Sequence, residues 1–320
     1  MIKTISAIVC TGLVATLLIV SCSQEGITPA GREEVLGEKL FFDPILSRDS
    51  SISCASCHKP EFAFADNLPT SPGVFHRNGT RNTPSVMNLV DRNAYFWDGR
   101  ASSLEEQALG PMENMVEMDF PLTLSVRRLA RNPYYSASFR KIYGSRPTKE
   151  LIGRAIAAYE ETLETSDTPF DDFVRDGDSS ALNASQKRGL EIFNNKGKCF
   201  DCHFGVDFTG NDQFKNIGLF NGKNLNDSGR FLISRRPQDI GAFKIPGLRN
   251  VAQTAPYMHN GMFKTLDEVI DFYNKPDDFV PDAINRDTIM HKPLGLSAEE
   301  KADLKNFLLA LSDRRFTSKP

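Results

Sequence analysis

The sequence lacks an excess of either charge. Its 38 Lys and Arg residues stand against 41 Asp and Glu residues, which gives a net charge of −3. Nothing in the composition suggests a strongly basic surface, so we expect no nucleic-acid partner. Tryptophan is also scarce, with Trp97 alone against 23 Phe. That scarcity marks Trp97 as a residue to follow.

Long apolar runs are scarce as well, and the clearest one lies at the N-terminus. The uncharged run Ile5–Val20 follows Lys3, and it is shorter than the roughly 20 residues of a membrane-spanning helix. It is typical of a signal peptide, so residues 1–21 are predicted to be removed on export. The run ends in Ile19-Val20-Ser21-Cys22, which resembles a bacterial lipobox with Cys22 as the lipidated residue. Plain secretion, with Cys22 free or removed, is the alternative, and both place the protein in the periplasm or cell envelope.

Cysteine is too scarce to leave a structural disulfide. Of the 6 Cys, Cys10 leaves with the predicted signal peptide and Cys22 takes the lipid. The others form two C-x-x-C pairs, each followed at once by His. These motifs are Cys54-Ala55-Ser56-Cys57-His58 and Cys199-Phe200-Asp201-Cys202-His203.

Each C-x-x-C-H motif is typical of covalent haem attachment. The two cysteines form thioethers with the haem vinyl groups, and the adjacent His supplies an axial iron ligand. Two such motifs in an exported protein predict two haem c groups. Zinc knuckles or disulfide loops are the alternative, but zinc would be expected to use both pairs as a single four-ligand site. A long stretch of chain and a predicted domain boundary separate the pairs.

Apolar residues at helical spacing predict several helices. We expect them at Arg32–Phe42, Thr148–Thr165, Asn183–Asn195 and from Ser297 onward. No segment alternates with period two, and Gly, Pro and Asn enrich the stretches between helices. The sequence therefore predicts a mainly α fold with long irregular loops.

A polar stretch near the middle of the chain divides it in two. Residues 166–180 are rich in Asp, Ser, Thr and Gly, which is typical of a boundary. Leu40-Phe41-Phe42 and Leu190-Glu191-Ile192-Phe193 also stand in comparable positions before the two haem motifs. We predict two tandem cytochrome c-like haem domains, residues 22–170 and 171–320.

The second axial position of each iron decides what the haem does. A strong side-chain ligand favours electron transfer, whereas an open position can bind peroxide or oxygen. Besides the two motif histidines, the chain contains only His76, His259 and His291.

Further motifs run through most of the chain in a fixed order. In the first half they are Arg81-Asn82-Thr83-Pro84-Ser85, Phe96-Trp97-Asp98-Gly99-Arg100, Glu106-Gln107-Ala108-Leu109-Gly110-Pro111 and Val116-Glu117-Met118. In the second half they are Pro246-Gly247-Leu248-Arg249-Asn250-Val251 and Thr254-Ala255-Pro256-Tyr257-Met258-His259-Asn260-Gly261. With them, the sequence resembles the bacterial di-haem cytochrome c peroxidase family, including its MauG-type branch.

The resemblance implies an enzyme with an asymmetric pair of haems. Peroxide bound at the first haem needs a proton moved between its oxygens, and the resemblance assigns this shuttle to Glu117 with Gln107 as its neutral partner. It places Trp97 between the haems as an electron relay. It also implies a Ca²⁺ ion held by Asn82 and the carbonyls of Thr254 and Pro256. The alternatives are a solvated helix face for Glu117 and Gln107, packing for Trp97, and turns for the calcium residues.

One departure from the family concerns the second haem. The well-known peroxidases place a Met fourteen positions after the His that matches His259, and Tyr273 stands there in this chain. A Tyr at this place resembles the MauG-type branch, where a tyrosine oxygen ligates the iron. A phenolate favours ferric and higher states, unlike a thioether. Tyr273 as an ordinary core residue is the alternative, and Met258, Met262 and Met290 remain as other candidate ligands.

Another departure concerns the first haem. Peroxidases that need reductive activation place a distal His seven residues before the Arg that matches Arg81, and Val74 stands there. The nearest candidate is His76, in a Pro- and Gly-containing loop. His76 either reaches the iron or faces solvent, in which case the first haem is open at rest.

The sequence thus predicts an exported, lipid-anchored cytochrome-c peroxidase. It would reduce hydrogen peroxide to water with electrons from a small c-type cytochrome or cupredoxin. One alternative is a MauG-like oxidase that acts on a protein or small molecule through high-valent haem. The other is a non-catalytic electron-transfer cytochrome, for which Glu117 and Gln107 would have no use. Assembly as a homodimer is left open.

Overall fold

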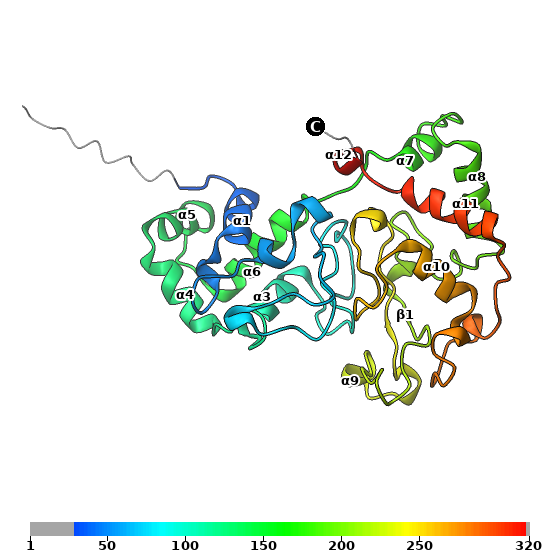
Figure 1. Cartoon of the computed structure of the whole chain (residues 1–320). Helices are drawn as coiled ribbons and strands as arrows, with labels where there is room; N and C mark the ends of the chain where they lie inside the picture. The colour runs from blue at the N-terminus through cyan, green and yellow to red at the C-terminus, as the bar shows by residue number, and fades with distance from the viewer. Residues whose placement is uncertain (1–28, 318–320) are drawn as a thin grey trace, which may run out of the picture.

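The structure, a computed structural model, describes residues 29–317. The predicted signal peptide and Cys22 lie outside these residues. Within them, no helix is both long enough and apolar enough to cross a membrane. Figure 1 shows two groups of helices joined through irregular loops, so the mainly α prediction is confirmed.

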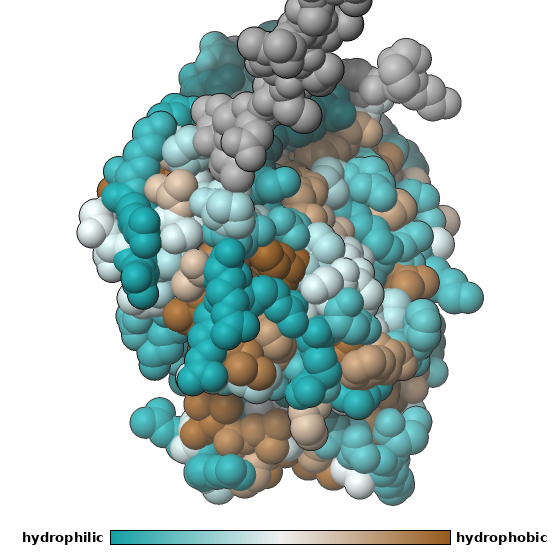
Figure 2. All heavy atoms as spheres, turned by 90° about the vertical axis from the view of Figure 1, so that its left-hand side faces the viewer, coloured by the Kyte–Doolittle hydropathy of each residue, from teal (hydrophilic) through white to brown (hydrophobic). Residues whose placement is uncertain are grey.

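The N-terminal group is built on α1 and α6. Its helices are α1 (Glu33–Phe42), α2 (Cys54–Cys57), α3 (Leu104–Glu113), α4 (Leu122–Arg131), α5 (Pro133–Tyr143) and α6 (Lys149–Glu160). Leu36, Leu40 and Phe41 of α1 are fully buried in one apolar core with residues of α6. On the side of the molecule where α4 and α5 lie, polar side chains cover much of the surface, and apolar groups show between them (Figure 2).

The C-terminal group is built on α8 and α11. Its elements are α7 (Pro169–Val174), α8 (Ala184–Asn194), α9 (Phe231–Ser234), α10 (Leu266–Asn274), α11 (Ala298–Leu309), α12 (Arg314–Thr317), β1 (Phe214–Lys215) and β2 (Phe243–Lys244). Phe193 of α8 and Phe307 of α11 pack edge to face at 5.2 Å in a second apolar core. The strands pair antiparallel, with Phe214 opposite Lys244.

A glycine makes the central helix contact close in each group. A Cβ on Gly37 of α1 would lie 1.8 Å from the carbonyl oxygen of Ala155 in α6, and one on Gly189 of α8 would lie 2.0 Å from that of Asp303 in α11. No side chain fits at either place, because the partner is backbone. In both groups, the helix that precedes a C-x-x-C-H motif thus packs on its partner in the same way.

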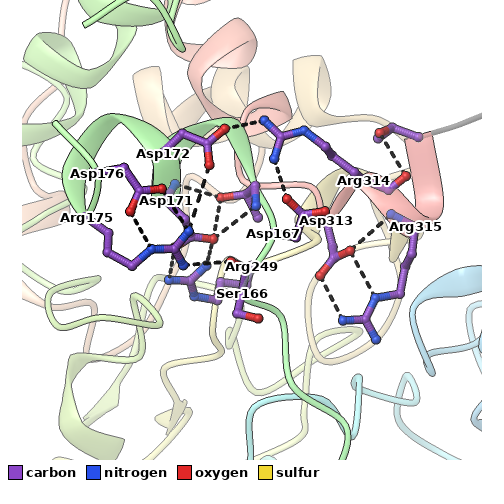
Figure 3. Close-up of polar contacts among 12 residues, drawn as sticks. Ser166, Asp167, Asp171, Asp172, Arg175, Asp176, Arg249, Asp313, Arg314 and Arg315 are labelled. Atoms are coloured by element: carbon purple, nitrogen blue, oxygen red, sulfur yellow. Dashed lines mark hydrogen bonds and ion pairs between the residues drawn. The ribbon is translucent and has the colours of Figure 1, made fainter. Parts of the chain in front are cut away.

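The segment predicted as a boundary contains a short helix, although most of its residues are exposed. Residues 166–180 contain α7, whose first turn is capped by Thr168 and Asp171 through a reciprocal capping box. Asp171 also pairs at 2.8 Å with Arg249 from the C-terminal group. Figure 3 shows how α7 and the segment around α12 meet through a network of carboxylates and guanidinium groups. Specific contacts therefore fix α7 to the rest of the C-terminal group.

The predicted helices agree with the structure except at one end. The helix predicted at Thr148–Thr165 begins after Thr148, which caps it, but ends at Glu160. The chain then makes a tight turn, in which Thr162 and Leu163 donate to the carbonyls of Tyr159 and Glu160. Beyond this turn, Thr165 is buried and accepts a hydrogen bond at 2.6 Å from Asn250. That contact with the C-terminal group overrides the local helical pattern.

Candidate functional site

The first C-x-x-C-H motif forms a single helical turn, α2. Ser53 and Ser56 cap it through a reciprocal capping box, and the backbone N–H of His58 donates to the carbonyl of Cys54. This turn brings both cysteines and the histidine to one place. The Nδ1–H of His58 then donates to the carbonyl oxygen of Phe64 at 3.1 Å.

The second motif repeats this arrangement. His203 donates its backbone N–H to the carbonyl of Cys199 at 2.7 Å, and its Nδ1–H to the carbonyl of Phe208 at 2.9 Å. A hydrogen bond at Nδ1 leaves the lone pair of Nε2 free for a metal. Burial also lowers the pKa of both motif histidines, His58 and His203, which favours the neutral ligand form.

The two carbonyls that orient these histidines share an unusual backbone conformation. Phe64 has φ +57° and Phe208 has φ +58°, in the left-handed region that costs a non-glycine residue about 1–3 kcal/mol. Both phenyl groups are buried, so packing holds the strained backbone in place. The sequence did not predict that Phe64 and Phe208 orient the two motif histidines. Their common place, shortly after each motif, is the signal that could have revealed them.

The four motif cysteines fit thioether attachment better than a shared zinc ion. Cys54 packs against the N-terminal core and Cys199 against the C-terminal core, so the pairs do not form one four-ligand site. Burial also raises the pKa of the Cys57 thiol to about 11 and that of Cys199 to about 12.

A largely apolar cavity opens beside the second motif. Cys199, Cys202 and His203 border it on one side, and Tyr273 of α10 borders it too. Residues of the N-terminal group, among them Trp97, complete its wall. Its other apolar lining includes Leu266, Val269, Ile270, Leu304 and Leu308. An apolar wall with a neutral imidazole and two cysteines matches what a covalently held porphyrin requires.

Tyr273 contributes an oxygen to this cavity. No hydrogen-bond partner for its hydroxyl exists among residues 29–317. Burial raises the pKa of Tyr273, and the nearby Cys202 and Cys199 raise it further. Of the alternative ligands, Met258 and Met290 also border the cavity, and Met262 is partly exposed at the surface.

Glu117 lies in a turn directly after α3. It is half-buried, and the side-chain amide of Asn114 donates to its Oε1 at 2.6 Å. Burial raises the pKa of Glu117, while Arg100 and the bond from Asn114 oppose the rise. The backbone of Gly73 packs against this turn so closely that a Cβ there would lie 2.2 Å from the carbonyl oxygen of Val116. The carboxyl is thus held in place with a raised pKa, which suits a group that exchanges protons.

Gln107 and His76 occupy contrasting environments. The Oε1 atom of Gln107 is buried and has no hydrogen-bond partner within the described part of the chain. Such an orphaned acceptor indicates room for a donor from a bound group. His76 instead lies in a 3-10 turn, Val74–His76, with its side chain exposed to solvent. Val74 is buried, and its N–H donates to the carbonyl of Glu117 at 2.8 Å.

Trp97 connects the two groups of helices. Its Nε1–H donates to the carbonyl of Asn82 at 2.8 Å, and its own carbonyl accepts from the N–H of Lys244 at 2.8 Å. Asn82 in turn donates its backbone N–H to the carbonyl of His259. The indole therefore sits in a fixed orientation beside the cavity of the second motif.

The three residues assigned to calcium by resemblance border the same cavity. These are Asn82, Thr254 and Pro256. Among residues 29–317, no group of three or more His, Cys, Asp and Glu side chains is placed to hold a metal ion. A cation at this place would therefore depend on amide and carbonyl oxygens.

A charged cluster that the sequence did not predict lies next to Asn82. Arg81 binds Asp227 through two hydrogen bonds of 2.7 and 2.9 Å, and Asp98 through one of 2.6 Å. Asp98 also accepts from Arg100 at 3.0 Å. The cluster joins the Arg81 motif and the Trp97 motif to a loop of the C-terminal group. Its only signal in sequence was the place of Arg81 and Asp98 in two of the recognised motifs.

Comparison with known proteins agrees with this geometry. The family described as di-haem cytochrome c peroxidase matches residues 32–179. Cytochrome c551 peroxidase of Pseudomonas aeruginosa is 42% identical over 247 residues, which cover 75% of this chain and 70% of that protein. The methylamine utilization protein MauG of Methylorubrum extorquens is 39% identical over 281 residues, with coverages of 86% and 77%.

Solved structures show the same architecture. A MauG-like protein associated with microbial copper homeostasis superposes with a TM-score of 0.80 at 28% identity, covering 92% of this chain and 93% of its own. The diheme peroxidase BthA from Burkholderia thailandensis gives a TM-score of 0.79 at 27% identity, with coverages of 91% and 88%. By sequence and by fold, the chain belongs to the di-haem cytochrome c peroxidase family.

Proposed function

We propose that this protein is a cytochrome-c peroxidase that reduces hydrogen peroxide to two molecules of water. The reaction consumes two electrons, from a small c-type cytochrome or cupredoxin, and two protons. The observation that carries the proposal is the half-buried carboxyl of Glu117, held by Asn114 and with a raised pKa. Such a group can take a proton from one peroxide oxygen and return it to the other.

We assign the haem groups by the motifs. Cys54, Cys57 and His58 would hold the first haem c, and Cys199, Cys202 and His203 the second. When bound, the haems supply the redox chemistry. The protein residues orient the haems, shield them from water and move the proton between the peroxide oxygens. The neutral imidazoles with their Nδ1 hydrogen bonds and the apolar cavity support this assignment.

The two haem domains are proposed as residues 22–170 and 171–320. Two separate apolar cores support the division, and Phe170 of α7 packs against the second one. We further propose Trp97 as the electron relay, since it lies between the halves and borders the second cavity. Asn82, Thr254 and Pro256 would hold one Ca²⁺ through oxygen atoms.

The first haem is proposed to be open at rest. The exposed side chain of His76 and the apolar side chain of Val74 support this, since neither offers a ligand from within the protein. Gln107, with its orphaned Oε1, would accept a hydrogen bond in the peroxide pocket. An exported, Cys22-lipidated form in the periplasm or cell envelope completes the proposal, and a homodimer is compatible with it.

One observation favours a second function. Tyr273 borders the second cavity with an unpartnered hydroxyl, and oxygen ligation by Tyr favours oxidised iron. This arrangement suits a MauG-like oxidation of a protein or small-molecule partner. A pure electron-transfer role would leave Glu117 and Gln107 without a purpose.

The decisive experiment measures peroxide consumption by the purified holoprotein with reduced cytochrome c or cupredoxin. We expect turnover in the native chain and its loss in Glu117→Gln, with both haems still bound. Glu113→Gln, at an exposed carboxyl at the end of α3, is the matched control and should keep full activity. Full activity of Glu117→Gln would remove the assigned proton shuttle, and no turnover with any donor would favour the MauG-like alternative.

A further inference from the structure

Lys244 is a buried cation at the edge of the second cavity. It lies in β2, with its side chain 15% exposed, and it borders the cavity together with Cys199 and His203. Its ammonium group is 3.8 Å from Asp212 Oδ1, which is too far for a hydrogen bond. An ammonium has three donors, and no hydrogen-bond acceptor for them exists among residues 29–317.

The other basic side chains around this cavity are already satisfied. The close pairs are Arg92 with Asp207, Arg249 with Asp171 and Asp207, and Lys215 with Asp287, each at 2.8 Å. Lys198 lies 4.0 Å from Asp201 but is 55% exposed, so water solvates it. Lys244 therefore differs from its neighbours in being both buried and without a close partner.

The nearest carboxylate is incompletely satisfied as well. Asp212 accepts the backbone N–H of Asn93 at its Oδ2, at 2.8 Å. Its Oδ1 is buried and lacks any hydrogen bond within the described residues. A buried charge is costly unless it is paired closely. The long contact leaves the Lys244 ammonium without a close acceptor, and an anionic group in the cavity that Lys244 borders would supply one.

The chemistry of a thioether-bound porphyrin supplies such an anion. Haem c is attached through its vinyl groups and carries two propionate carboxylates on the opposite edge. With Cys199 and Cys202 holding the vinyl edge, a cation elsewhere on the cavity wall is placed to receive a carboxylate. We propose that the ammonium group of Lys244 binds a propionate of the second haem and that its charge raises the reduction potential of that haem. This inference rests on the proposed attachment of haem to the second motif.

The expected direction follows from electrostatics. Reduction of the iron adds one negative charge, and a buried ammonium nearby stabilises the reduced state more than the oxidised one. Lys244 also donates its backbone N–H to the carbonyl of Trp97. Through its backbone, Lys244 therefore holds β2 against Trp97, the proposed electron relay. Through its side chain, it sets the reduction potential of the second haem.

The test is the midpoint potential of the second haem, measured by spectroelectrochemical titration of the holoprotein. In Lys244→Gln the potential should fall. At the potential where the second haem of the native protein is half reduced, the reduced-to-oxidised ratio of that haem in the variant should be about tenfold lower. This corresponds to a potential shift of ~59 mV for one electron. Lys198→Gln, at an exposed lysine on the same cavity, should leave the ratio unchanged, and Lys244→Arg should keep it near the native value.

An unchanged potential in Lys244→Gln would overturn the proposal and leave Lys244 as a partner of Asp212 alone. If that variant fails to fold or to bind the second haem, a crystal structure of the native holoprotein decides. It must place a propionate oxygen within ~3.2 Å of the Lys244 ammonium nitrogen, and a propionate bound elsewhere would overturn the proposal. The potential does not depend on peroxide turnover, so this result is separable from a failure of the proposed activity.

Discussion

The side-chain amide of Asn114 donates a hydrogen bond of 2.6 Å to the carboxyl of Glu117. This bond stabilises the carboxylate, so it keeps the pKa of Glu117 from rising as far as burial alone would raise it. If Glu117 must be ionised to accept a proton from peroxide, the bond sets the acid limb of the activity profile.

Replacing Asn114 should therefore move that limb. In Asn114→Ala the pKa of Glu117 rises further, and kcat/KM for peroxide should begin to fall at a higher pH than in the native protein. Asn114→Asp adds a like charge and should move the limb further in the same direction. The pH dependence of steady-state kcat/KM measures both, and identical limbs in all three proteins would contradict the role of Glu117.

Tyr273 makes a separate prediction about the second haem. Tyr273→Phe should change the absorption and electron paramagnetic resonance spectra of that haem, because an iron ligand is lost. Tyr273→Met should instead raise its potential, since a thioether favours ferrous iron. Tyr257→Phe is the control, because Tyr257 also borders the cavity. If Tyr257→Phe alters the spectrum and Tyr273→Phe does not, Tyr257 and not Tyr273 is the candidate iron ligand.

The elements that sequence predicted best are those with strong local signals. The helices predicted from Ser297 and from Asn183 both begin as expected, with capping boxes formed by Ser297 and Glu300 and by Asn183 and Gln186. In these segments the cap and the apolar spacing indicate the same start. The prediction of α6 extended too far because the contact between Thr165 and Asn250 is long-range, and no local pattern reports such a contact.

In the candidate site, too, the sequence predicted the local features and missed those that depend on the fold. The cysteines and histidines of the two motifs were visible from spacing alone, because the chemistry needs them as neighbours. The carbonyls of Phe64 and Phe208, which orient those histidines, were not. Backbone acceptors depend on conformation and not on residue type, so a sequence pattern describes them poorly.

The close helix contact at Gly37 predicts a steric effect on stability. In Gly37→Ala the new Cβ would meet the carbonyl of Ala155, so α1 and α6 must separate, and we expect a loss of about 1–3 kcal/mol. Gly31→Ala is the matched control, because a Cβ at that position meets only the flexible end of Lys141 at 3.5 Å. Urea unfolding of both variants measures the difference, and equal stabilities would show that α1 can shift without cost.

Arg249 makes the last prediction, at an ion-pair network within the C-terminal group. Its guanidinium is 6% exposed and pairs with Asp171 and Asp207 at 2.8 Å (Figure 3 shows the pair with Asp171). Arg249→Met leaves Asp171 without its guanidinium partner, while Asp207 keeps its pair with Arg92, and we expect a loss of about 3–5 kcal/mol at pH 7. Arg175→Met, in the same segment but 57% exposed, should cost no more than about 1 kcal/mol.

The effect of Arg249→Met should depend on pH in one direction. Burial alone would raise the pKa of Asp171, but the hydrogen bonds from Arg249 and Thr168 hold it below its ordinary value. A carboxyl with a lowered pKa in the folded protein contributes stability above its unfolded pKa of about 3.9 and loses it as the pH falls through the folded value. The difference between native and Arg249→Met proteins should therefore shrink when urea unfolding is repeated near pH 3. A difference that stays constant from pH 7 to pH 3 would mean that Arg249 stabilises the contact through packing and not through its charge.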